Sequence, residues 1–285
     1  MTFPLPSSRS TLVAGAPGPG LGFWSGSPGA ALGSDGTWVV AYRVREGVGP
    51  ESGARTVVAV SDDGEWFSTV ATLDKSRFDA MSMERPSVVQ LEDGRWRLYT
   101  CCATKGSKHW WIDALDADEP AGFESADART VFPGDDQVAV KDPIVRRTGS
   151  DWEAWICCHP LDVPDAEDRM TTAYATSGDG LEWKWRGTVF EPRPGTWYAR
   201  GARLTAILPD GSAAFDGRAT KEENWFERTG LARRVDARWE AATEVPVSHV
   251  RYLEVVALPN GGHRIFYESP LPDASHELRT ELIEA

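Results

Sequence analysis

A short pattern recurs five times along this chain of 285 residues and constrains the fold more than any other feature. Each copy has an apolar run, a polar turn and a second run rich in aromatic side chains. In four copies the turn contains Asp-Gly or Asn-Gly, which favour tight β-hairpins. The first runs are aligned at positions 28, 86, 143, 203 and 253, spaced by 58, 57, 60 and 50 residues. A period of this length predicts a repeat architecture, and the hairpins make it all-β.

The second half of each repeat supplies two further strands. In the first and third copies these strands flank polar turns at residues 62–64 and 178–180, each followed by a Trp placed to pack between sheets. Weaker versions lie near residues 114–118 and 235–239. Four strands in each of five repeats predict a five-bladed β-propeller with four-stranded antiparallel blades.

The fifth copy is short of strands. After Tyr267 only residues 278–283 remain to form one, and an incomplete blade would leave an open sheet edge. Residues 10–14 have the pattern of a strand and are the natural donor. We therefore expect the N- and C-terminal segments to share one blade and close the ring. No linker interrupts the repeats, so residues 1–285 are expected to form a single domain.

Net charge and cysteine pattern narrow the classes of function. A formal net charge of −13 would repel a polyanion, so we expect no nucleic-acid partner. No apolar run approaches the length of a membrane span, and the N-terminus lacks a signal-peptide pattern. The adjacent pairs Cys101–Cys102 and Cys157–Cys158 would form strained disulfides, because neighbouring side chains on a strand point to opposite faces. They predict free thiols in a cytoplasmic protein, with no metal site and no cofactor.

The central channel is where a propeller concentrates its function, and the innermost strand of each blade lines it. The residues beside the five aligned positions are therefore the candidates for a site. The first copy offers the uncharged residues 24–27, whereas every other copy offers charged ones. Buried charges are costly unless they are paired or functional, so the set is either an ion-pair network or a polar ligand site. Its members are Glu84, Arg85, Lys141, Asp142, Arg200, Arg251 and Glu254.

The fivefold pattern, the strands that open on a proline and the Ser-x-Asp-Gly turns followed by Trp resemble the five-bladed glycoside hydrolases of families 43, 62, 32 and 68. The resemblance covers essentially the whole chain. It implies three carboxylates in the funnel: a first-blade Asp as base or nucleophile, a third-blade Asp before Pro, and a Glu that acts as the acid and is often followed by Gly in the fourth blade of family 43. Asp142 before Pro143 matches the third-blade element. Ser27 and Arg200 stand where the other two carboxylates would be.

Other carboxylates are therefore candidates for the missing catalytic groups. Glycoside hydrolysis needs two facing carboxyl groups. Glu84, Asp142 and Glu254 all lie near the channel in this alignment, and we consider Asp142 with Glu84 or Glu254 as the acid–base pair. Each also has a structural interpretation, as an ion pair that holds neighbouring blades together.

Arginines and aromatic residues define the expected ligand. The mannoside phosphorylase family, a more distant resemblance, shares this fold and surrounds its phosphate with basic side chains. A planar guanidinium suits carboxylate, phosphate or sulfate, so an anionic sugar or other small acid is the expected substrate. We expect it to be bound by four arginines, three aromatic platforms and a histidine at the channel mouth: Arg43, Arg85, Arg200, Arg251, Trp24, Trp197, Tyr198 and His159.

Two functions are compatible with this sequence. The first is a glycosidase-like hydrolase that acts on a small, anionic sugar or glycoside by carboxylate acid–base chemistry. The second is a repurposed propeller that binds a carbohydrate or small acid, or that catalyses a different reaction such as an elimination or a cyclisation. Ser27 and Arg200, at the positions of absent carboxylates, motivate the second hypothesis.

Overall fold

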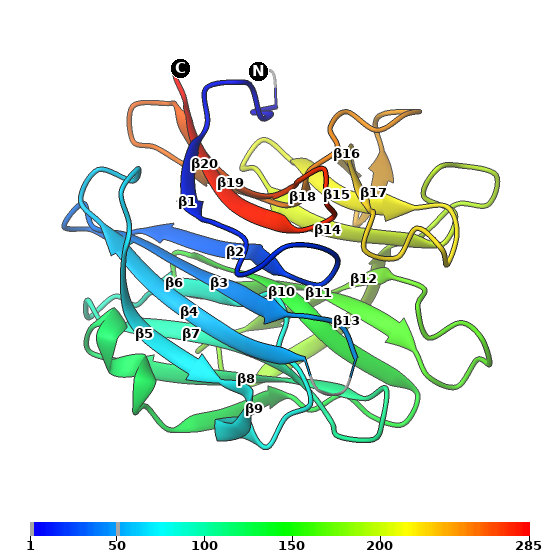
Figure 1. Cartoon of the computed structure of the whole chain (residues 1–285), viewed down its shortest axis with the longest axis horizontal. Coiled ribbons are helices and arrows are strands. Elements are labelled where there is room, and N and C mark those ends of the chain that lie inside the picture. The colour runs from blue at the N-terminus through cyan, green and yellow to red at the C-terminus, as the bar shows by residue number, and fades with distance from the viewer. Residues whose placement is uncertain (1–2, 50–51) are drawn as a thin grey trace.

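The described part of the chain is folded from β-strands and two short 3-10 helices (Figure 1). The structure is a computed structural model that describes residues 3–49 and 52–285. Among these residues, no helix has the length and apolar character needed to cross a membrane. The 3-10 helices are η1 (Lys75–Phe78) and η2 (Pro120–Glu124).

Three sheets each contain four strands that follow one another along the chain and pair antiparallel. This arrangement confirms the predicted four-stranded antiparallel sheets of a propeller. The first sheet holds β6 (Ser87–Gln90), β7 (Trp96–Ala103), β8 (Trp110–Ala117) and β9 (Ala128–Phe132); the second holds β10 (Val138–Thr148), β11 (Asp151–Pro160), β12 (Thr171–Ser177) and β13 (Trp183–Phe190); the third holds β14 (Gly201–Ile207), β15 (Ser212–Arg218), β16 (Arg228–Val235) and β17 (Arg238–Ala241).

A fourth sheet of eight strands contains both ends of the chain. One half is an antiparallel run from β2 to β5, and the other runs from β18 to β20 with β1 added to β20 (Figure 1). The halves meet at one parallel pair, Trp24 with His276. The predicted pairing of the N- and C-terminal segments is therefore present. The strands are β1 (Thr11–Ala14), β2 (Trp24–Leu32), β3 (Trp38–Glu46), β4 (Gly53–Ser61), β5 (Ser68–Asp74), β18 (Arg251–Ala257), β19 (His263–Pro270) and β20 (His276–Ile283).

The five predicted hairpins are confirmed by the pairing of β2 with β3, β6 with β7, β10 with β11, β14 with β15, and β18 with β19. The turns work as the sequence indicates. Gly36 and Gly94 have φ angles of 90° and 88°, a region that side chains with a Cβ rarely enter. Local turn chemistry thus sets where each hairpin reverses.

Apolar side chains fill the spaces between successive sheets. Trp155 of β11 packs with Leu204 and Phe215 of the next sheet. Within the eight-stranded sheet, Val40 of β3 packs with Phe266 of β19 across its two halves. The four cysteines are free and buried. Those of each adjacent pair point to opposite sides of one strand, as predicted, so that Cys101 and Cys102 belong to different apolar clusters.

Candidate functional site

A cavity of about 430 Å³ lies near the start of β10, β14 and β18, with walls from all four sheets. Eight cationic side chains line it against five carboxylates, although the whole chain carries a net charge of −13. The lining is therefore positive where the protein as a whole is negative. The cations are Arg43, Arg45, Lys108, Lys141, Arg203, Arg218, Lys221 and Arg251, and the carboxylates are Glu84, Asp165, Glu167, Asp168 and Glu227.

Three of the first strands bend at equivalent positions. β2, β10 and β18 each shift register against their hairpin partner at one bulge. Inside these bulges Ser27, Asp142 and Tyr252 have φ angles of 53°, 51° and 51°. Left-handed backbone is uncommon for residues other than glycine and often marks strained, functional positions. These three residues therefore occupy one structural position in three repeats. A bulge at that position changes the direction in which the side chain points.

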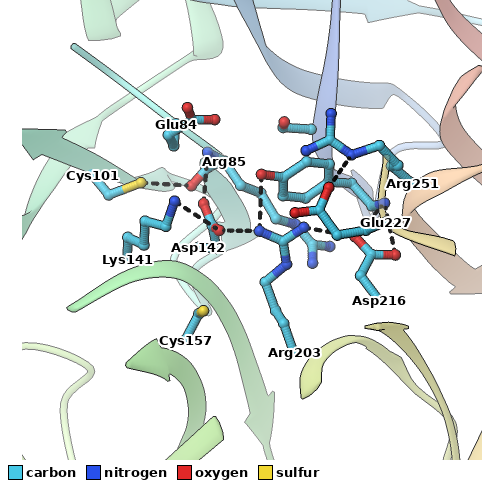
Figure 2. Close-up of polar contacts among 12 residues, drawn as sticks. Glu84, Arg85, Cys101, Lys141, Asp142, Cys157, Arg203, Asp216, Glu227 and Arg251 are labelled. Carbon is cyan, nitrogen blue, oxygen red and sulfur yellow. Dashed lines mark hydrogen bonds and ion pairs between the residues drawn. The ribbon is translucent and has the colours of Figure 1, made fainter. Parts of the chain in front are cut away.

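Asp142 is buried and does not line the cavity. Its carboxylate accepts a hydrogen bond from Arg203 Nη1 at 2.6 Å, and Lys141 Nζ lies 3.9 Å away (Figure 2). Arg203 Nη2 binds Asp216 at 2.7 Å, so one guanidinium bridges two carboxylates. Burial raises the pKa of Asp142, but Lys141 and Arg203 outweigh it and hold this pKa at about 2. Asp142 is therefore ionised at neutral pH and unsuited to donate a proton.

Glu84 lines the cavity between two arginines. Its Oε2 atom pairs with Arg43, and its Oε1 atom lies 3.3 Å from Arg45 Nη1. The structure thus brings Glu84 and Arg43, two of the residues expected from the sequence, to the same wall.

Glu268 is fully buried behind this wall and contacts three side chains. It accepts from Arg43 Nη2 at 2.7 Å and Arg251 Nη1 at 2.9 Å, and lies 2.6 Å from His276 Nδ1. Burial raises the pKa of Glu268, but Arg43 and Arg251 hold it well below its usual range. Trp24, expected as a sugar platform, is also fully buried and stacks on His276 at 5.2 Å, under the arginines. Its role here is to support the cationic wall.

Glu227 lines the cavity and was not anticipated from the sequence. Arg218 Nη1 and Arg251 Nε lie 2.6 Å and 2.8 Å from its two carboxylate oxygens (Figure 2 shows the Arg251 contact). Burial raises the pKa of Glu227, but Arg251 and Arg218 hold it at about 2. The residue directly precedes β16, outside the aligned strand starts, and no repeat pattern marks it.

His159 lines the cavity as a neutral side chain. Burial lowers the pKa of His159 to about 3, and Lys141 and Arg218 act in the same direction. Nδ1 lies 2.9 Å from the carbonyl oxygen of Glu167, so Nδ1–H is the donor. The other ring nitrogen, Nε2, lies 3.5 Å from Cys157 Sγ. Both nitrogens have protein neighbours, which fixes the ring as part of the wall.

Glu254 and Arg85 lie apart from this cavity. They form an ion pair at 2.5 Å, and Arg85 also donates to the carbonyl oxygen of Pro28 at 2.9 Å. Burial raises the pKa of Glu254, against the opposing effect of Arg85 and Arg146. Glu254 lines a different cavity, between the later parts of the first strands. The structure therefore does not place Glu254 with Glu84 at one site.

Arg200, Tyr198 and Trp197 do not line the cavity either. Arg200 binds both oxygens of Asp168, at 2.9 Å and 2.5 Å. Tyr198 and Trp197 pack against Phe215 in the apolar space between sheets. Gly217 and Gly230 make room for Trp197, since a Cβ on either would come within 2.6 Å of its ring. The expectation that these two aromatic residues form sugar platforms is corrected by this packing.

Two other tryptophans line the cavity in their place. Trp110 has Lys141 Nζ 5.1 Å above its ring. Trp225 has a φ of 77° and lies 5.9 Å from Trp24. Left-handed backbone at so large a residue is a strained conformation that the surrounding loop must hold. Aromatic faces beside cations suit a ligand with both a sugar ring and an acidic group.

Comparison with known proteins relates the fold to carbohydrate-active propellers. No family model matches the sequence, and no curated protein sequence matches it. Among solved structures, β-1,2-mannobiose phosphorylase from Listeria innocua has a TM-score of 0.65 at 12% identity, over 93% of this chain and 90% of that one. An α-L-arabinofuranosidase from Lactobacillus brevis has a TM-score of 0.65 at 15% identity, over 90% of each chain. The arabinofuranosidase Arb93A from Fusarium graminearum has a TM-score of 0.62 at 11% identity, over 96% and 97%.

These structural similarities show which fold the chain has. They confirm the resemblance drawn from the sequence, since the similar structures are propellers of the glycoside hydrolase and mannoside phosphorylase type. At such low identity a shared fold does not carry over a shared reaction. The function must be argued from the cavity itself.

Proposed function

We propose that this propeller binds an anionic small molecule, a sugar acid or a sugar phosphate, in the arginine-lined cavity. The charge of the lining carries the proposal: eight cations face five carboxylates in a chain of net charge −13. A ligand carboxylate or phosphate offers two oxygens in the geometry that a guanidinium binds.

Hydrolysis by the three carboxylates expected from the sequence has weaker support. A glycosidase of that kind keeps one carboxylic acid protonated beside the scissile bond. Asp142 has a pKa of about 2 and does not line the cavity, so it does not supply such an acid. Both carboxylate oxygens of Glu84 are held in ion pairs with arginines. Glu254, whose pKa is raised, pairs with Arg85 and lines another cavity. We therefore favour the repurposed propeller over the hydrolase.

A glycoside phosphorylase is the second candidate, and the basic lining favours it as well. Phosphate is an anion that these arginines would hold, and one similar structure is titled a β-1,2-mannobiose phosphorylase. Incubation with β-1,2-mannobiose and inorganic phosphate, followed by phosphorus NMR, tests this candidate. Mannose 1-phosphate is the expected product. Phosphorolysis releases one mannose along with each mannose 1-phosphate, so mannose formed without mannose 1-phosphate would indicate hydrolysis instead, and unchanged disaccharide would remove this substrate from consideration.

The fold proposed for the whole chain is one domain, residues 1–285, of five four-stranded blades. In this view the eight-stranded sheet comprises the first and fifth blades, and β1 completes the fifth. Apolar clusters between successive sheets support the proposal, and so does the cluster that joins Val40 and Phe266 across the two halves of the eight-stranded sheet. A closed ring would place the cavity at one mouth of the central channel.

Isothermal titration calorimetry with inorganic phosphate, D-glucuronate and neutral D-glucose tests the binding proposal. We expect both anions to bind, more weakly at high salt, and glucose to bind far less. Arg45→Gln is the informative variant, because Arg45 lines the cavity and has one ion pair, to Glu84 at 3.3 Å. Losing a charge-assisted hydrogen bond weakens binding about 10-fold or more.

The matched control is Arg238→Gln. Arg238 is a half-exposed arginine paired with Glu191 outside the cavity, so its replacement should leave anion binding unchanged. Equal affinity of wild-type protein for glucose and glucuronate would contradict the proposal. So would an equal loss of anion binding in both arginine variants, because that would indicate attraction by overall charge.

A further inference from the structure

Tyr252 is the counterpart of Asp142 in the fifth repeat. Both residues sit in the bulge of a first strand with a φ of 51°. Of the three bulge residues, Tyr252 alone lines the cavity. Asp142 is bound to Arg203, and Ser27 Oγ lies 3.3 Å from Glu268. The position that holds a carboxylate in the third repeat therefore presents a phenol to the cavity in the fifth.

The surroundings of Tyr252 hold its ring in one place. Its backbone N–H donates to Asp216 at 3.0 Å, which fixes the strained bulge. The guanidinium carbon of Arg203 lies 3.8 Å from the ring centroid, and that of Arg251 lies 5.1 Å away. Only 2% of the residue is exposed. A bulky residue held in left-handed backbone by specific contacts is pre-organised rather than adaptable.

Within the part of the chain that the structure describes, the hydroxyl group of Tyr252 accepts a hydrogen bond but donates none. It accepts a hydrogen bond from Arg203 Nη1 at 2.9 Å. A phenol also carries one proton to donate. Among residues 3–49 and 52–285, no oxygen accepts that proton. Burial raises the pKa of Tyr252 well above its ordinary value, so the proton stays in place at neutral pH.

We propose that the Tyr252 hydroxyl donates a hydrogen bond to an oxygen of the bound anion, and so orients the ligand that the arginines attract. This inference rests on the proposed function, because it concerns the same cavity. The arginines recognise negative charge from several sides, whereas Tyr252 requires an acceptor oxygen at one fixed point. Tyr252 is thus a specificity-determining binding residue for carboxylate or phosphoryl oxygen.

Tyr252→Phe separates this role from a structural one. The variant keeps the ring beside Arg203 and removes only the hydroxyl, and Arg203 Nη1 retains Asp142 as an acceptor at 2.6 Å. Ligand-free protein should therefore keep its melting temperature. The dissociation constants for inorganic phosphate and D-glucuronate should rise about 10- to 100-fold, as expected for a lost hydrogen bond to a charged acceptor.

Tyr99→Phe is the matched control. Tyr99 is fully buried away from the cavity, and its hydroxyl donates to the carbonyl oxygen of Gly180 at 2.8 Å. This variant should melt at a lower temperature and bind both anions as wild type does. A melting temperature for Tyr252→Phe that falls as far as that of Tyr99→Phe would overturn the inference, because the proton would then have an internal acceptor.

The anion titrations distinguish failure of this inference from failure of the proposed function. Wild-type affinity in Tyr252→Phe overturns the role of Tyr252 and leaves anion binding in place. If wild-type protein binds neither phosphate nor glucuronate, the proposed function falls and this role falls with it. Weaker binding to Tyr252→Phe with an unchanged melting temperature supports both.

Discussion

Replacing Asp142 with Asn tests whether this carboxylate serves as an ion-pair partner beside the cavity. The buried carboxylate accepts from Arg203 at 2.6 Å and from the backbone N–H of Arg85 at 3.2 Å. Asn has nearly the same size and tolerates the left-handed backbone at this position, but its one carbonyl oxygen replaces only one of the two carboxylate oxygens that accept these bonds. The substitution therefore removes one negative charge and one of the two hydrogen bonds that the carboxylate accepts. Arg203 then retains a single carboxylate partner, Asp216.

The pKa of Asp142 gives the size of the effect. It is held at about 2, against an ordinary value of 3.8. At 1.36 kcal/mol per pKa unit, the charged form stabilises the folded protein by about 2 kcal/mol. Because the folded-state pKa is the lower one, this stabilisation is present above pH 3.8 and is lost as the pH falls towards 2. At neutral pH the melting temperature should drop by roughly 5 °C for a chain of this size.

Urea unfolding followed by tryptophan fluorescence measures this difference at pH 7 and at pH 3. We expect Asp142→Asn to be less stable by about 2 kcal/mol at pH 7 and by about half of that at pH 3. Asp151→Asn, at an exposed aspartate that begins β11, is the control and should unfold as wild type does at both pH values. Equal stability of Asp142→Asn and wild type at pH 7, or a difference that persists undiminished at low pH, would refute the ion-pair reasoning.

Three further predictions concern other parts of the molecule. Glu227→Gln should lose about 3 kcal/mol at pH 7, because the pKa of Glu227 is about 2 against 4.5, and urea titrations should show the loss closing as pH falls from 4.5 towards 2. The four buried cysteines, whose pKa values burial raises, should react with Ellman's reagent only after denaturation; labelling of native protein would contradict their placement. Deleting residues 1–14 should lower the melting temperature and promote self-association on size-exclusion chromatography, because it exposes the edge of β20. An unchanged melting temperature and elution volume would contradict the pairing of β1 with β20.

The strands were predictable because their signals are local. Asp-Gly and Asn-Gly turns fix where a hairpin reverses, and alternating apolar residues fix which face is buried. The pairing of β1 with β20 was also predictable, from the shortage of strands in the last repeat. The 3-10 helices η1 and η2 were missed, since each is a short connection with no repeated pattern.

The candidate site was only partly predictable, because it depends on contacts between distant strands. The sequence directs attention to the starts of the first strands, and Glu84, Arg43, Arg251 and His159 do line the cavity. It gives no means of deciding that Arg203 rather than Arg200 lines the cavity. Changing the strand position of a side chain by one residue reverses the face to which it points, and bulges alter that count locally.

The ion pairs behind the cavity are better explained by positioning than by stability. Burying a charged pair costs desolvation free energy that its attraction barely repays, so an apolar replacement of similar volume is often as stable. Glu268 contacts three groups, Arg43, Arg251 and His276. Arg203 forms ion pairs with both Asp142 and Asp216. These carboxylates fix the guanidinium groups in direction and leave the lining with more cations than anions. Compared with apolar side chains of the same volume, such a network adds little stability, and it gives an incoming anion a rigid set of donors that need not reorganise on binding.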